Sequence, residues 1–234
     1  MGVMPEHRAW TRVPRTLFTA TRVARLQARA RKPPSLTGHE RGPGLSGNRP
    51  CFRGITAAMT TTLDAKLSFI VGRRSIRAYQ AAPVSDEIVT NLLAAAMAAP
   101  SACAKDPWRF VVMRHRDTLT AVADALPNGK MLAQAAVGIA VCGDLGAAHA
   151  GELSYLLQDC SAAIENLLLG AHVLGLGACW LGVHPRQPRM DAVTRILGLP
   201  DKVVPVSCIA LGWPAEEKPP RTRYTPAHVH SERW

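Results

Sequence analysis

The sequence predicts a globular domain of the α/β or α+β class, in which helices cover a central sheet. Three observations support this class. Amphipathic stretches alternate along the chain with short apolar runs that have the length and β-branched composition of buried strands. No internal repeat is present, and 234 residues suit one domain with an appendage.

The appendage is the first 58 residues. They hold 11 of the 28 Lys and Arg residues but only two of the 17 acidic residues, which gives a formal net charge of +9. The other 176 residues carry only +2. Arg, Pro and Gly dominate residues 1–58 and no apolar period is present, so we expect a disordered basic extension there and a folded domain over residues 59–234.

Three explanations of the extension stay open. Met59 is a suitable natural start, which would make residues 1–58 an upstream translation artefact. The Arg-rich, acid-poor composition also fits a targeting arm. An arm that binds nucleic acid or acidic lipid is the third explanation.

The first elements of the folded domain are two helices. One ends near Gly72, and the second covers residues 85–99. Ser85 is a candidate N-cap, and two acidic residues follow it in the positively polarised first turn. We expect the second helix to stop at Pro100, because proline cannot continue a helix.

Strands and shorter helices follow in alternation. Continuous apolar runs predict buried strands over residues 109–114, 136–144 and 203–213. Short helices are expected over residues 117–126 and 190–200, the second ended by a glycine and a proline. A Pro-rich, charged tail completes the chain.

A longer helix is expected over residues 152–174. Its second half is apolar on nearly every side, which is not typical of a surface helix. Such a helix lies either at the centre of a domain or inside an oligomer interface.

Several classes of protein are disfavoured by what the sequence lacks. The longest apolar run, near residues 135–143, is far shorter than the ~20 residues that span a bilayer. The six cysteines form no CxxC pair and four lie in apolar runs, so we expect buried reduced thiols, no metal and a cytoplasmic protein. Asp159 and Glu165 are either acid/base groups or polar points on a buried helix.

No standard catalytic motif is present in the sequence. There is no nucleophile elbow, Walker loop, GxGxxG after a strand, HExxH or paired-carboxylate arrangement. The two histidines of "HVH" in the tail are more typical of solvated surface than of a metal site. We therefore expect a cofactor, rather than catalytic side chains, to carry any chemistry.

Three segments are candidates for holding that cofactor. "GRRSIRAY" (72–79) places three arginines beside a serine, and arginines bind phosphate through charge-assisted bonds. "VLGLGACWLG" (173–182) has glycines that allow a flat ligand close to the backbone. "PPRTRY" (219–224) alternates two arginines, which face the same side of an extended chain. Taken singly, these segments also fit a solvated basic turn, a tight turn between helix and strand, and a polar tail.

Together the segments resemble the nitroreductase family of FMN-dependent α+β flavoproteins. The resemblance covers residues 63–234 and rests on four pieces in order: "RRSIR" (73–77), "APSA…PWRF" (99–110), "QDCSAAIENLLLGAHVLGLGACWLG" (158–182) and "ALGWPAEEKPPRTRY" (210–224). It implies a three-layer sandwich with a mixed, mainly antiparallel sheet. It also implies a homodimer with FMN at its interface, in which the C-terminal arms are exchanged.

The resemblance assigns FMN-binding roles to particular residues. It implies that FMN is bound by Arg73, Arg74, Ser75 and Arg77, with Arg73 and Ser75 nearest the phosphate or the pyrimidine edge. Arg221 and Arg223 match positions that close the phosphate site. Leu181 and Gly182 match the segment whose backbone faces flavin N5. The other subunit is expected to contribute Pro100, Ser101 and Ala102.

One departure from the family pattern stands out. The family commonly has Pro-Ser-Ala-x-Asn-x-Gln-Pro-Trp, whereas this chain has Ala104 at the Asn position and Asp106 at the Gln position. A hydrogen bond to the ring would then be missing. A carboxylate near the ring would disfavour a reduced, anionic flavin.

The activity implied by the resemblance is hydride transfer from NADH or NADPH, through FMN, to an electron-poor small molecule such as a nitroaromatic, quinone or enone. Other reactions of the fold, reductive dehalogenation and flavin breakdown, stay open. A flavin- or nucleic-acid-binding protein without turnover is the alternative of another class, and neither a membrane nor nucleic acid is the expected partner.

Overall fold

The computed structural model describes residues 65–234. The predictions for residues 1–58, and for the boundary at residue 59, lie outside the described residues. The expected first helix can be followed only at its end, as the short helix α1 (Ser68–Gly72), and that end is where the sequence placed it.

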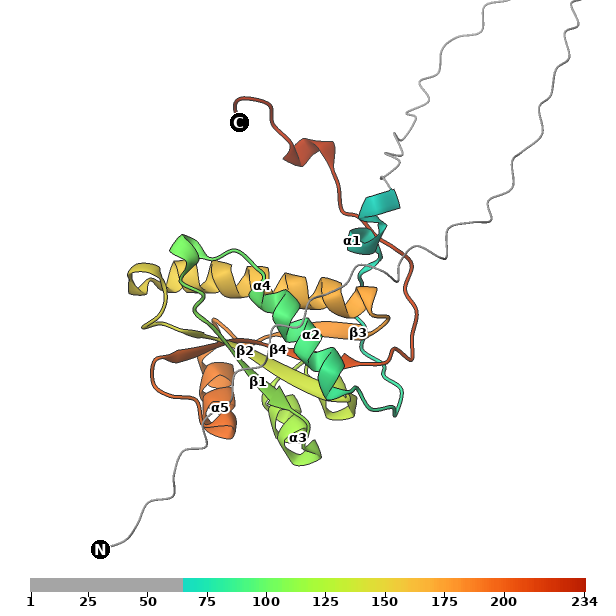
Figure 1. Ribbon diagram of the computed structural model, residues 1–234, viewed down its shortest axis with the longest axis vertical. Helices are drawn as coiled ribbons and strands as arrows, with labels where there is room; N and C mark the ends of the chain where they lie inside the picture. The colour runs from blue at the N-terminus through green and yellow to red at the C-terminus, as the bar shows by residue number, and fades with distance from the viewer. Residues whose placement is uncertain (1–64) are drawn as a thin grey trace, which may run out of the picture. The chain divides into compact units, whose positions relative to one another are not determined.

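A four-stranded antiparallel sheet in the order β1-β2-β4-β3 forms the centre of the domain (Figure 1). The two inner strands, β2 and β4, are buried along almost their whole length, which explains why they are continuous apolar runs in the sequence. The strands are β1 (Trp108–Met113), β2 (Val137–Asp144), β3 (Gly177–Gly182) and β4 (Val203–Gly212).

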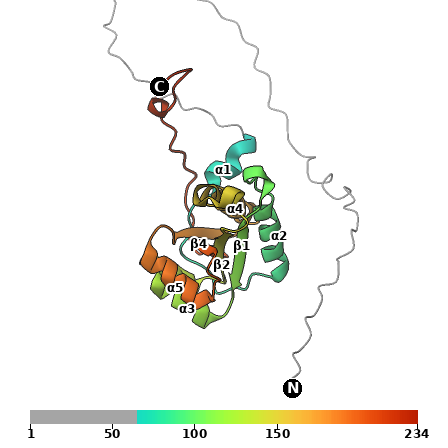
Figure 2. The same ribbon diagram turned by 90° about the vertical axis from the view of Figure 1, so that its left-hand side faces the viewer.

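Helices cover both faces of the sheet (Figures 1 and 2). Successive side chains of a strand point to opposite faces, so Ile139 packs in one core cluster and Ala140 in the other. The first cluster lies under α2 (Asp86–Met97) and α4 (Leu153–Val173), the second under α3 (Arg116–Ala125) and α5 (Gln187–Leu197). The predicted three-layer α+β sandwich is confirmed.

The sequence signals for helix ends are confirmed at two places. The Ser85 hydroxyl accepts a hydrogen bond from the backbone N–H of Ile88 at 3.3 Å, which caps α2. Gly198 ends α5 in the left-handed conformation, with φ of 63°.

The long helix α4 buries one stripe and leaves another exposed. The buried stripe recurs every three or four residues and packs on the sheet. At its C-terminal end, however, Val173 is 65% exposed and Leu174 44%. The helix is therefore central to its own domain, and its end leaves apolar surface uncovered in the single chain.

Among the four strands within residues 65–234, β3 is the one that the sequence did not predict. Residues 173–182 were expected to form a glycine-rich loop or turn, but Gly177–Gly182 pairs along its whole length with β4. Glycine weakens strand propensity, and here pairing with a buried neighbour overrides it. A Cβ at Gly177 would lie 2.8 Å from Ile76 Cβ, so this glycine permits the close approach of the chain beside it.

Candidate functional site

Six of the predicted site residues surround one basic pocket of about 490 Å³. Four come from the segment after α1 and two from the C-terminal tail, so the fold brings together residues that are far apart in the sequence. A seventh residue, Lys218, was not predicted. The pocket is lined by Arg73, Arg74, Ser75, Arg77, Lys218, Arg221 and Arg223.

The first of these segments is held against the edge of the sheet. Ser75 forms a parallel bridge with Ala178 of β3, and the Ile76 N–H donates to the Ala178 carbonyl at 3.0 Å. This bridge is the parallel component of an otherwise antiparallel sheet. Ile76 points into the space beside Gly177. The side chains next to it in the chain, Ser75 and Arg77, therefore remain half-buried and exposed, respectively, around the pocket.

The tail returns to the same place through backbone contacts. The Arg221 N–H donates to the Val71 carbonyl at 3.0 Å, and Arg74 Nη1 donates to the Pro219 carbonyl. Lys218 Nζ donates to the Ser75 carbonyl at 2.8 Å. The only sequence signal for Lys218 was its place three residues before Arg221.

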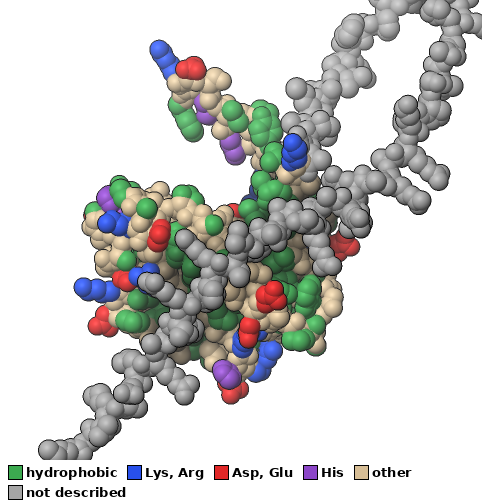
Figure 3. Space-filling model, viewed as in Figure 1, with side chains coloured by type: hydrophobic (Ala, Val, Ile, Leu, Met, Phe, Trp, Pro, Cys, Tyr) green, Lys and Arg blue, Asp and Glu red, His purple; other side chains and the backbone are tan. Residues whose placement is uncertain are grey.

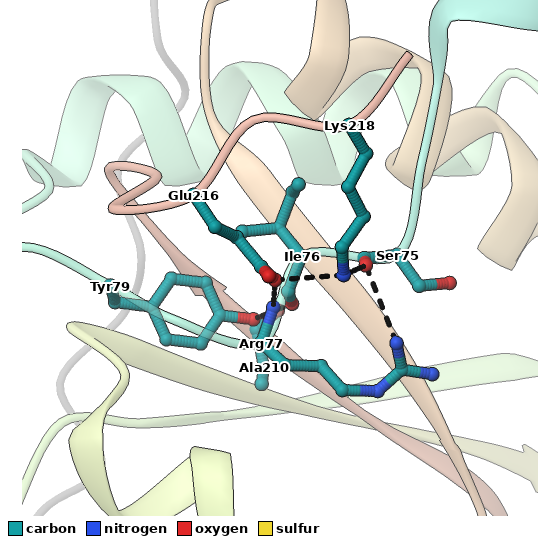
Figure 4. A network of polar contacts seen from close by, with 7 residues as sticks. All are labelled: Ser75, Ile76, Arg77, Tyr79, Ala210, Glu216 and Lys218. Carbon is teal, nitrogen blue, oxygen red and sulfur yellow. Dashed lines mark hydrogen bonds and ion pairs between the residues drawn. The ribbon is translucent and has the colours of Figure 1, made fainter. Parts of the chain in front are cut away.

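A polar network joins the C-terminal tail to the segment after α1 (Figure 4). Glu216 Oε1 accepts from the Arg77 N–H at 2.5 Å and lies 2.9 Å from Lys218 Nζ. The hydrogen bond from Lys218, followed by the one from Arg77, holds the pKa of Glu216 below its usual value. Behind it the Tyr79 hydroxyl donates to the Ile76 carbonyl at 2.7 Å, and burial raises the pKa of this hydroxyl so that it stays protonated.

The pocket keeps an excess of positive charge. Glu165 Oε1 lies 3.3 Å from Arg73 Nε, and Glu216 partly neutralises Lys218. The side chains of Arg221 and Arg223 have no hydrogen-bond or ion-pair partner within residues 65–234. Unneutralised guanidinium groups around one cavity suit a doubly charged anion such as a phosphate monoester.

A second pocket of about 520 Å³ adjoins the first, because Arg77 lines both. It contains the predicted residues Leu181 and Gly182, together with apolar side chains such as Trp180. A Cβ built at Gly182 would meet no heavy atom within 4 Å. This glycine is therefore not required by packing within the chain, and it leaves a flat stretch of backbone open to a ligand.

Comparisons with known proteins agree with this geometry. The profile of the nitroreductase family matches residues 70–130 and 115–213. The chain belongs to the nitroreductase family.

Relatives within the family are similar over most of the domain. A protein of Archaeoglobus fulgidus, provisionally named NADH dehydrogenase/NAD(P)H nitroreductase, is 43% identical over 177 residues, which are 74% of this chain and 100% of the relative. A similarly named structure from Bacteroides thetaiotaomicron has 39% identity and a TM-score of 0.69, and covers 74% of this chain and 100% of its own. A provisionally assigned nitroreductase from Desulfovibrio desulfuricans, solved in complex with FMN, has 32% identity and a TM-score of 0.63, with 74% and 99% covered. The chain is thus of the NAD(P)H-linked oxidoreductase family that these names describe.

The remaining predicted residues, Pro100, Ser101 and Ala102, line neither pocket. They begin a loop that closes on itself. Ser101 Oγ donates to Asp106 Oδ1 at 2.5 Å and accepts from the Asp106 N–H at 3.0 Å. Within the described chain Asp106 therefore bonds its own loop, and a carboxylate beside the ring of a second subunit stays a prediction.

Strained backbone and a buried anchor also shape this loop. Three non-glycine residues, Cys103, Ala104 and Asp106, have positive φ of 48–51°. Asp159 of α4 is buried, and its Oδ1 accepts from the Ala102 N–H at 2.9 Å. Of the two roles considered for Asp159, the structure thus shows a polar anchor on a buried helix.

The surface, the helices and the cysteines add three observations. On the face seen in Figure 3, the described acidic and basic side chains are interspersed, so that face has no field of a single sign. Within residues 65–234, no helix combines the length and apolar character needed to cross a bilayer. Four of the cysteines are buried free thiols, as the apolar runs predicted, and Cys103 is exposed.

Proposed function

We propose that the protein is an FMN-dependent oxidoreductase that uses NADH or NADPH to reduce an electron-poor acceptor, such as a nitroaromatic, a quinone or an enone. The observation that carries the proposal is the pair of adjoining pockets. One is basic enough for the FMN phosphate, and the other opens onto Gly182, where a flat ring has room. The FMN complex of the Desulfovibrio desulfuricans relative supports the choice of cofactor.

In this proposal the side chains bind and orient the cofactor. Arg73, Ser75, Arg221 and Arg223 hold the phosphate, with Arg74 and Lys218 at the same pocket. Arg77 lies where the two pockets meet and places a positive charge beside the ring. FMN bound by these residues would supply the hydride chemistry that links the nicotinamide to the acceptor. The protein's contribution is orientation and a polar field around the ring.

We further propose that the active unit is a homodimer. The loop that begins at Pro100 lies outside both pockets of its own chain, which is consistent with a contribution to a second copy. Apolar side chains near the ends of α1 and α4 are exposed in the single chain, including Ile70 at 45% and Val173 at 65%. Covering them in a dimer would remove apolar surface from water.

The absorbance spectrum of the purified protein tests the proposal most directly. We expect a yellow protein with flavin absorption that NADPH or NADH bleaches in the absence of air, and whose colour returns on addition of a nitroaromatic or quinone. Release of the chromophore by heat and its identification by mass spectrometry would distinguish FMN from other flavins. A colourless protein that takes up no added FMN would refute the proposal.

A further inference from the structure

Among the five arginines of the basic pocket, only Arg73 pairs its guanidinium group with a carboxylate of residues 65–234. Arg73 Nε lies 3.3 Å from Glu165 Oε1. In this part of the chain the nitrogen is buried and has no hydrogen bond of standard geometry. An N–H group that is removed from water without an acceptor costs free energy. The Glu165 carboxylate therefore offsets the burial of this edge of the guanidinium group.

Glu165 reaches Arg73 from helix α4 and not from inside the pocket. Its side chain lines neither the basic pocket nor the pocket around Gly182. Two turns further along α4, His172 lies against the residue before Arg73, because a Cβ built at Gly72 would be 2.8 Å from His172 Nε2. Helix positions seven residues apart lie on one face. One face of α4 thus supports the segment after α1 at two consecutive residues.

The ion pair orders Arg73 before any ligand is bound. A guanidinium group is planar, so a contact at Nε restricts the orientation of the two Nη atoms. These Nη atoms donate no hydrogen bond within residues 65–234 and remain available. Arg221 and Arg223 differ, because their side chains have no partner in the same part of the chain. Binding costs less free energy when a side chain is already held in place.

We infer that Glu165 is a positioning residue for the cofactor, which holds Arg73 at Nε and leaves its Nη groups for the phosphate of FMN. The inference rests on the proposed function. Of the two roles considered for Glu165, an acid/base group or a polar point on a helix, it selects the second and gives that polar point a function.

The carboxylate has two effects on FMN binding, and their signs are opposite. A negative charge near the pocket repels a phosphate, so its removal alone would strengthen binding. Loss of the contact to Arg73 would weaken binding. The Glu165 side chain is 46% exposed, so solvent screens the repulsion, and we expect the weakening to dominate.

The experiment is a fluorescence titration of the flavin-free protein with FMN and with riboflavin, which has the same ring but no phosphate. The variants are Glu165→Ala, Glu165→Gln, Arg73→Ala and the combination of Glu165→Ala with Arg73→Ala. Glu217→Ala is the matched control, since it removes an exposed carboxylate of the tail that has no ion pair within residues 65–234. Urea unfolding of each variant checks that the fold is retained.

We expect Glu165→Ala to raise the dissociation constant of FMN by about tenfold, which corresponds to about 1.4 kcal/mol. Glu165→Gln keeps an oxygen that can accept from Nε and should recover most of the loss. Riboflavin affinity should not change. In the Arg73→Ala background Glu165→Ala should have little further effect, because the contact acts through the Arg73 side chain. Glu217→Ala should leave FMN affinity unchanged or slightly higher.

Three results would overturn the inference: FMN affinity that is unchanged or higher in Glu165→Ala, an equal loss for FMN and riboflavin, or an undiminished loss in the Arg73→Ala background. Each of these results, in a protein that binds FMN, leaves the proposed function intact. A protein that takes up no FMN refutes the proposed function instead. The same variants are then titrated with inorganic phosphate by calorimetry, where equal affinities of Glu165→Ala and the parent would overturn the inference.

Discussion

The basic pocket between Arg73 and Arg223 and the loop from Pro100 to Asp106 are built in opposite ways. The pocket joins two segments that are distant in the sequence, and its contacts include a bond between residues 139 positions apart, from Arg77 to Glu216. The loop bonds mainly to itself, through Ser101 and Asp106, and is tied to the domain at Ala102. Residues of one chain line the basic pocket, whereas Pro100, Ser101 and Ala102 line neither that pocket nor the one around Gly182.

Because they are built differently, the two regions should affect different properties of the protein when they are mutated. A long-range pocket of unneutralised cations is stabilised by the ligand it binds, because the ligand offsets their mutual repulsion. The loop keeps three non-glycine residues in a left-handed conformation, and such strain persists only where surrounding contacts impose it. The pocket should therefore respond to mutation mainly in cofactor affinity, and the loop mainly in stability and in properties of the ring.

The largest effect of mutation is expected at the basic pocket, on the affinity for FMN. Replacing Arg221 and Arg223 together by Ala should raise the dissociation constant of FMN by about two to four orders of magnitude, since each charge-assisted bond is worth about 1.5–3 kcal/mol. Both side chains are exposed, so the lower end is expected. Fluorescence titration measures the constant, with Arg233→Ala as the control. Undiminished affinity would show that the tail does not bind the phosphate.

The next largest effect is expected from replacing Asp159, which anchors the loop. Asp159→Ala removes the acceptor of the Ala102 N–H. This donor is only partly buried, so its loss of a partner should cost near the lower end of the about 1–3 kcal/mol found for buried groups. Asp159→Asn keeps an acceptor oxygen and should be much less destabilised in thermal or urea unfolding. If the two variants unfold alike, the hydrogen bond does not anchor the loop.

A smaller effect is expected at Ala104, where the loop departs from the family pattern. Asn tolerates positive φ better than Ala, so Ala104→Asn should fold at least as well as the parent. If residue 104 faces the ring of a partner subunit, one restored hydrogen bond of about 1 kcal/mol would raise the flavin potential by about 20 mV. Spectroelectrochemical titration can resolve this shift. An unchanged or lower potential would mean that residue 104 lies away from the ring.

The smallest effect concerns the network behind the pocket. The pKa of Glu216 is lower in the folded protein than its ordinary value of 4.5, so its charge stabilises the fold above about pH 4.5 and this contribution is lost as the pH falls through the folded pKa. Glu216→Gln should therefore be less stable than the parent at pH 7, by up to about 1 kcal/mol for a partly exposed ion pair.

The pH dependence separates this effect from a simple loss of contacts. The stabilities of the two proteins in urea unfolding should converge as the pH falls through the folded pKa of Glu216, where the parent carboxyl also becomes neutral. Glu217→Gln, next in the chain and exposed, serves as the control. A difference in the free energy of unfolding that does not shrink as the pH is lowered from 7 into the acid range would exclude the ionised carboxylate as its cause.

Much of this protein could be predicted from neighbouring residues alone. The cap at Ser85, the ending at Gly198 and the buried inner strands each depend on a few adjacent residues, and the structure confirms them. The arginines of "RRSIR" and "PPRTRY" also predicted a pair of anion-binding segments, since guanidinium groups carry that chemistry wherever they are placed, and the structure brings the two segments to one pocket.

Only the tertiary structure decided how these parts meet. Strand β3 was missed because its glycines have low strand propensity, and only its pairing with β4 makes it a strand. The contacts of Glu216 and Lys218 depend on the tail returning to Ser75 and Arg77. Local propensity and periodicity reflect residues that are adjacent in the chain, whereas a pocket is formed by residues brought together from distant positions, and the packing that brings them together is absent from any short stretch of sequence.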